Sequence, residues 1–172
     1  MTVSQPAVKY GLIAGIGTVA YFLLFYFIDS KLLFNPFVYW ASLGFYLALM
    51  WRALQVEAQA AGENFGFQSA LRSAFLVFVI ANLLYYLFYY LLYSLIDPGL
   101  IDLQREAMRE SLDQQGHLLS EEQREELLES LKDGRLAPTV SGVFFTFVRS
   151  LIGGFVAALG MAALWGRRGM ND

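Results

Sequence analysis

Charged residues within long apolar stretches are the first places in this sequence to look for chemistry. Arg149 interrupts an otherwise uncharged run near the end of the chain. If a helix begins near Ser141, Arg149 lies about 12 Å along its axis, at a depth where a guanidinium needs an anion or water. We predict Asp97 and Asp29, which end two other apolar runs, as its partners. Two interpretations stay open: an ion-paired gate or anionic-headgroup site, and an arginine that extends to the membrane interface beside an acid.

A polar face on the third apolar run is the second candidate. Asn82, Tyr86, Tyr89 and Tyr93 are separated by four, three and four residues, so a helix places them on one side. Such a face either lines a polar cavity for a lipid, quinone or solute, or forms hydrogen bonds between helices. Each cross-helix hydrogen bond in a membrane is worth roughly 0.6 kcal/mol. Helix packing is the favoured interpretation.

Small residues at four-residue spacing indicate close contacts between helices. They form pairs in the first and last apolar runs: Gly11 and Gly15, Gly153 and Ala157, Gly154 and Ala158. Small side chains let helix backbones approach closely, which matters where lipid gives no hydrophobic drive for association. We predict contact between the first and fourth helices of one chain.

The residue types that catalysis and metal binding require are scarce. The chain has no cysteine and one histidine, His117, which excludes disulfides, thiol nucleophiles and clusters of imidazole ligands. Glu121, Glu125 and Glu129 repeat every four residues, but one helix surface does not surround a cation as a calcium loop does. We therefore expect a protein that is not an enzyme and has no cofactor and no metal site.

The composition explains where these residues must sit. Of 172 residues, 57% are hydrophobic and 16% are charged, with a mean hydropathy of +0.48, whereas a soluble domain carries about a quarter charged residues. The net charge of −3 argues against a nucleic-acid partner. A membrane-spanning helix needs about 20 mostly apolar residues. We predict an all-α integral membrane protein, a single four-helix bundle over residues 1–172. Its four transmembrane helices lie at about residues 10–28, 36–54, 69–96 and 141–165.

Residues 97–140 differ from the rest of the chain. They include eleven acidic and five basic residues. Asp97 before Pro98 is typical of a helix start, and Ser120 followed by Gln123 is typical of a capping box. Gly116 and Gly134 predict two helix ends. We predict an extramembrane helical hairpin, inserted between the third and fourth transmembrane helices.

The orientation follows from the number of spans and the basic residues beside them. Four spans place both termini on one side of the membrane. Arg167 and Arg168 lie next to the last span, which favours the cytoplasm for the termini, although the total count of basic residues mildly favours the reverse.

Three segments of the chain resemble one bacterial membrane family. They are residues 9–15 (KYGLIAG), residues 63–72 (ENFGFQSALR) and residues 119–123 (LSEEQ). The family is catalogued as domain of unknown function 4199, and the resemblance covers nearly the whole chain in order. It implies a small inner-membrane protein with four spans and supplies no reaction, substrate or catalytic residue.

Two functions fit these patterns. The first is a non-enzymatic accessory or scaffold protein of the bacterial inner membrane. Its partners are the lipid bilayer and, through the acidic hairpin, another membrane protein or a second copy. The alternative is a small transporter or lipid-binding protein that uses Arg149 and Asn82. A cavity at which Asn82, Tyr86 and Arg149 meet favours the alternative, and a filled bundle favours the scaffold.

Overall fold

The chain is built from long helices. The computed structural model describes residues 4–62, 65–115, 120–132 and 137–168, and these residues include no β-strand. Four of the described helices are long and apolar enough to cross a membrane, which confirms the predicted all-helical class with four candidate spans. They are α1 (Gln5–Ile28), α2 (Pro36–Ala61), α3 (Phe67–Leu91) with its π-helical extension η3 (Leu92–Ile96), and α6 (Val140–Arg168).

The short connection between α1 and α2 is capped by its own polar residues. It is the 3-10 helix η1 (Ser30–Phe34). The Asp29 carboxylate accepts a hydrogen bond from the Lys31 amide at 2.9 Å, and the Asn35 side-chain carbonyl accepts one from the Phe37 amide at 2.9 Å. These bonds satisfy amides that a helix start leaves without a partner.

α2 continues beyond its predicted end at residue 54 and reaches Ala61. Polar residues follow the apolar stretch there, and they are compatible with a helix although not with the hydrocarbon layer. Gly62 then ends α2 with a φ of 57°, in the left-handed region that favours glycine.

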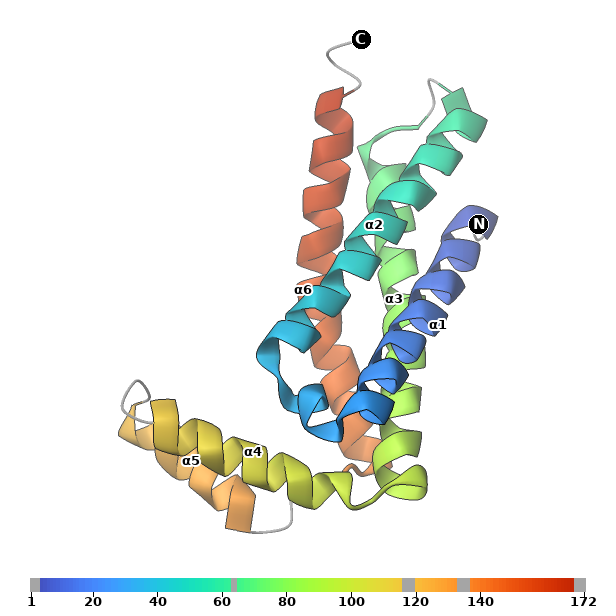
Figure 1. Cartoon of the computed structure of the whole chain (residues 1–172). Coiled ribbons are helices and arrows are strands. Elements are labelled where there is room, and N and C mark those ends of the chain that lie inside the picture. Colours follow the sequence, from blue (N-terminus) through green and yellow to red (C-terminus); the bar gives the residue numbers. More distant parts are fainter. Residues whose placement is uncertain (1–3, 63–64, 116–119, 133–136, 169–172) are drawn as a thin grey trace.

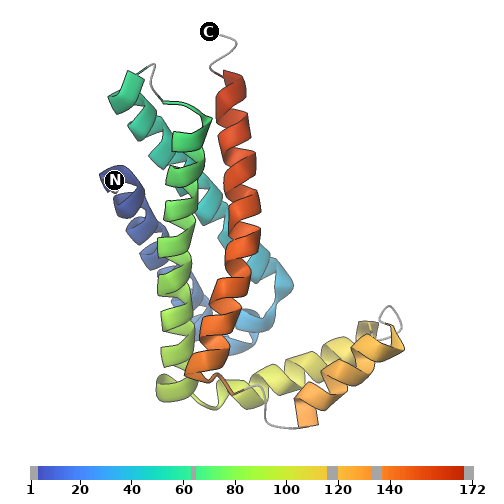
Figure 2. The same ribbon diagram turned by 180° about the vertical axis from the view of Figure 1, so that it is seen from behind.

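Two shorter helices, α4 (Leu100–Gln115) and α5 (Glu121–Lys132), lie beside one another at the end of the bundle opposite to the chain termini (Figures 1 and 2). The predicted capping box is present at the start of α5. The Gln123 backbone amide donates to the Ser120 hydroxyl at 3.3 Å, and the Ser120 backbone amide donates to the Gln123 side-chain carbonyl at 3.2 Å. His117 and the predicted helix ends at Gly116 and Gly134 lie outside the described residues.

α4 begins later than predicted. Pro98 lies in a turn before the helix, and the Asp97 carboxylate accepts a hydrogen bond from the Gly99 amide at 3.1 Å. Leu100, the first residue of α4, is buried against Leu92 and Tyr93 of η3. The start of α4 is therefore fixed to the end of the third long helix.

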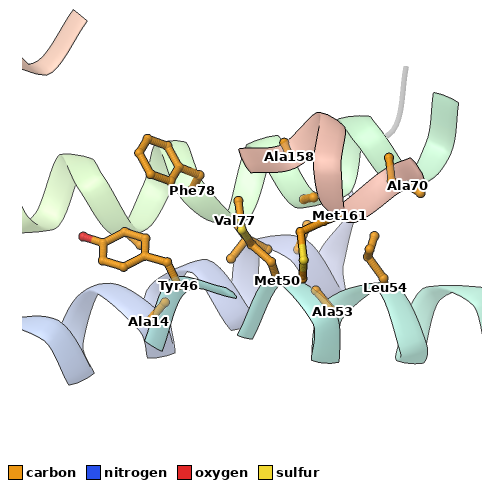
Figure 3. Packing of buried hydrophobic residues seen from close by; sticks show 14 residues of the cluster. Ala14, Tyr46, Met50, Ala53, Leu54, Ala70, Val77, Phe78, Ala158 and Met161 are labelled. Carbon is orange, nitrogen blue, oxygen red and sulfur yellow. The ribbon is translucent and has the colours of Figure 1, made fainter. Parts of the chain in front are cut away.

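α3 lies at the centre of the four long helices (Figure 1). It packs along α1 on one side and along α6 on the other, and it also contacts α2. α2 and α6 contact each other much less. Figure 3 shows the buried core between these helices, which includes Ala14, Tyr46, Met50, Ala53, Leu54, Ala70, Val77, Phe78, Ala158 and Met161.

The glycines of α1 contact α3. A Cβ atom added at Gly11 would lie 2.9 Å from the Cβ of Ile80, and one added at Gly15 would lie 2.5 Å from a methyl carbon of Leu84. Both glycines are buried. The predicted contact between the first and fourth helices is therefore wrong, because α3 lies between α1 and α6.

The small residues of α6 divide between two surroundings. Gly154 packs so closely on the ring of Phe78 in α3 that an added Cβ would overlap the ring. Ala158 is buried in the core. Gly153 and Ala157 line a cavity between α6 and α2, and Gly154 lines it as well.

Candidate functional site

A cavity of about 350 Å³ lies between α2, α3 and α6, with α1 at its inner wall. This volume falls in the range of about 300–1,000 Å³ that is typical of small-molecule sites. Most of the lining is aromatic or aliphatic. The lining residues that carry a polar group are Thr18, Tyr39, Trp40, Ser42, Tyr46, Asn82, Tyr85 and Ser150.

The cavity opens sideways, between α2 and α6. On the α6 side, Gly153 lines the cavity and is exposed, and a Cβ atom added there would meet no described atom within 4 Å. On the α2 side, Trp40 and Leu47 line the cavity and remain 65% and 44% exposed. With the helices across a bilayer, this opening faces the lipid chains.

Polar groups of α3 and α6 meet on the wall of the cavity. The Asn82 side-chain amide donates a hydrogen bond to the Ser150 hydroxyl at 2.5 Å, and that hydroxyl donates to the Phe147 carbonyl at 2.5 Å. Asn82 is only 6% exposed. The contact links two helices and also places an amide and a hydroxyl beside an apolar space.

The Thr18 hydroxyl is a buried polar group of this cavity without a hydrogen bond. Thr18 is 1% exposed, and its Oγ1 forms no hydrogen bond among the described residues. The Tyr46 side chain lies near enough for a weak hydrogen-bond interaction with it, outside the geometry of a normal hydrogen bond. A buried hydroxyl without a partner costs about 1–3 kcal/mol. A polar group of a bound molecule, or a water molecule, would remove this cost.

The predicted polar face of α3 is divided between different surroundings. Asn82 lines the cavity, whereas Tyr86 lies in an apolar groove between α3 and α6 and packs on Phe147 with ring centroids 6.1 Å apart. Tyr89 and Tyr93 pack on each other with centroids 4.4 Å apart. The cavity residue that the spacing argument missed is Tyr85. It follows Asn82 by three residues, so helical periodicity alone could have found it.

Arg149 is exposed on α6 and forms no ion pair within the part of the chain that the structure describes. Asp97 accepts a hydrogen bond from the Tyr26 hydroxyl at 3.0 Å, and Asp29 caps η1. Among the described residues, neither of these two predicted partners forms an ion pair with Arg149. Of the three residues expected to meet at a cavity, Asn82 lines it, and Tyr86 and Arg149 do not.

A polar contact that the sequence analysis missed joins α1, α2 and α3. The Glu57 carboxylate of α2 accepts hydrogen bonds from the Ser73 hydroxyl of α3 at 2.6 Å and from the Ser4 hydroxyl at the start of α1. Ser73 is 2% exposed. The partners of Glu57 are 16 and 53 residues away in the chain, so no local pattern identifies them.

Four long apolar helices indicate, by their length and composition, a multi-pass membrane protein. The chain belongs to the family described as Protein of unknown function (DUF4199), whose sequence pattern it matches over residues 9–167. This match confirms the resemblance found in the sequence. No curated protein and no solved structure matches the chain.

Proposed function

We propose that the protein binds one molecule of the lipid class in the cavity between α2, α3 and α6. The observation that carries this proposal is the combination of apolar walls, a lateral opening and the polar groups of Thr18, Asn82 and Ser150. A molecule with an apolar chain enters such a cavity from the bilayer without crossing water. This is the alternative left open from the sequence; the bundle is not filled, and of the three residues named for that alternative Asn82 alone lines the cavity.

The proposal includes binding without catalysis, in the bacterial inner membrane, with both termini in the cytoplasm. Among the described residues, no three acidic or histidine side chains are grouped to hold a metal ion. The family resemblance supports the inner-membrane location. Arg167 and Arg168, at the end of the last span, support the orientation.

Filling the cavity tests the proposal. We expect Gly153→Phe to place a ring in the open space at the α6 side and to remove the bound molecule. Gly160→Phe is the matched control, because Gly160 is an exposed glycine of the same helix, with open space around it and outside this cavity. The measurement is native mass spectrometry of protein extracted gently from its membrane, together with binding of a fluorescent fatty acid.

The wild type and Gly160→Phe should each retain one lipid-class molecule per chain, and Gly153→Phe should retain none. The fatty-acid probe should follow the same order. Equal retention by the two phenylalanine variants contradicts the assignment of the cavity as the site.

A second function is supported by the position of α4 and α5. We propose that they form the acidic extramembrane hairpin and bind a basic partner protein. Beyond the anchor at Leu100, α4 contacts mainly η1. Glu121, Glu122 and Glu125 of α5 are exposed.

Charge reversal on α5 tests this second function and leaves the contact of Leu100 with η3 intact. The triple variant Glu121→Lys, Glu122→Lys, Glu125→Lys should no longer bind the proteins that co-purify with the wild type. Its melting temperature should be unchanged. If the charge reversal does not affect co-purification, the proposed binding of a basic partner is overturned. Deleting residues 100–135 is a coarser version of the same test.

A further inference from the structure

We infer that the molecule in the cavity is an anionic phospholipid whose phosphate group is held by Arg149 at the mouth. This inference rests on the lipid-binding function proposed above. Thr146, Arg149, Ser150 and Gly153 follow the i, i+3, i+4, i+7 spacing of one helix face, and the last two line the cavity. Arg149 is exposed and directly precedes Ser150 of the cavity wall.

The charge of Arg149 needs compensation at this depth. Arg149 follows Val140, the first residue of α6, by nine residues, or about 14 Å along the axis. At such a depth an arginine pairs with an acid, extends to the interface, or draws water and lipid headgroups to itself. The two acids predicted as its partners form no ion pair with it among the described residues; Asp97 accepts a hydrogen bond from Tyr26 and Asp29 caps η1. A guanidinium matches phosphate through two parallel hydrogen bonds.

The direction of the cavity fits the orientation of a phospholipid. Along α6 the cavity extends from Ser150 to Ala157, away from Arg149 and toward the middle of the helix. Along α2 it extends from Tyr39, near the start of the helix, to Met50. A phosphate at Arg149 therefore lies in the half of α6 nearer its start, and an acyl chain in the cavity extends from it toward the other end of the helix.

Lipid competition tests the inference. The full-length protein is equilibrated with equal amounts of phosphatidylglycerol and phosphatidylethanolamine of the same chain length, and the retained lipid is identified by native mass spectrometry. We expect the wild type to be enriched in phosphatidylglycerol and Arg149→Gln to lose about fivefold of that enrichment, since one basic residue near anionic lipid is worth about that factor. Arg149→Lys should keep most of it. Arg52→Gln, which removes an exposed arginine near the other end of the bundle, should leave it unchanged.

The outcomes separate this inference from the proposed function. If Arg149→Gln retains lipid with undiminished enrichment, the role of Arg149 is overturned and the cavity remains a lipid site. If the wild type retains no lipid, the proposed function fails and the inference fails with it. Glycerol phosphate is added as a soluble competitor. If it displaces the lipid in an Arg149-dependent way, the site is one for a free phosphate compound and the lipid assignment is overturned.

Discussion

Glu57 holds three helices together through one carboxylate oxygen. Its two partners, the hydroxyls of Ser4 and Ser73, come from α1 and α3. Removing an acceptor from a buried donor costs more than the hydrogen bond itself contributes, because the donor is left without a partner. This contact therefore secures the end of the bundle at which α2 extends beyond its apolar stretch.

We predict that Glu57→Ala lowers the free energy of unfolding by about 1–3 kcal/mol, since Ser73 stays buried and loses its acceptor. Glu57→Gln keeps a carbonyl acceptor and should lose less. The measurement is unfolding in mild detergent, followed by circular dichroism. Gln59→Ala, at an exposed position of the same helix, is the control, and equal melting of Glu57→Ala and Gln59→Ala contradicts the prediction.

Single-residue features were predictable from the sequence only where they are local. The capping box of Ser120 and Gln123 spans three residues, and the structure contains it. The surroundings of Arg149 depend on which carboxylates are already engaged. The Tyr26 contact with Asp97 joins residues 71 positions apart, and no sequence spacing reports it.

At the scale of helices, close contact with α3 is the main determinant of packing. The backbone of α1 approaches α3 at Gly11 and Gly15, and α6 approaches it at Gly154. The spacing of small residues correctly indicated faces that pack closely. It predicted the wrong partner helix for α1. A helix face of small residues can pack against any helix, and the spatial order of the helices is not a local property of the sequence.

We predict that Gly15→Ala destabilises the bundle by about 1–3 kcal/mol, as overpacking does elsewhere. The added methyl would meet Leu84 at 2.5 Å and the Cα of Ala81 at 3.2 Å. Gly17→Ala on the same helix is the control, since its methyl would lie 3.7 Å from the Phe45 ring, an ordinary contact. Denaturant titration of the two variants measures the difference, and equal stability contradicts a tight α1–α3 contact.

At the scale of the whole molecule, the four long helices were predictable because the bilayer imposes a length and a composition. The cavity was not. Its existence depends on how far α2 stands from α6, which follows from the packing of both around α3. Hydropathy identifies the segments that cross a membrane and carries no information about the spaces left between them.

The absence of cysteine makes the proposed orientation testable with single substitutions. We predict that Glu122→Cys, in α5, reacts with a membrane-impermeant maleimide added to intact cells after the outer membrane is opened. Gln59→Cys, at the other end of the bundle, should react only after the inner membrane is permeabilised. The reverse pattern contradicts the orientation, and immediate labelling of both contradicts a single span, α3, between the two positions.

The central position of α3 has a consequence for how the protein is made. A ribosome delivers α1 and α2 to the membrane before α3 has been synthesised, and α6 follows only after α4 and α5. The surfaces of α1 and α2 that end up against α3 are therefore covered by lipid during the first part of synthesis. The bundle acquires its main contacts when the third long helix enters the bilayer, and α6 completes it by packing on a surface that is already in place.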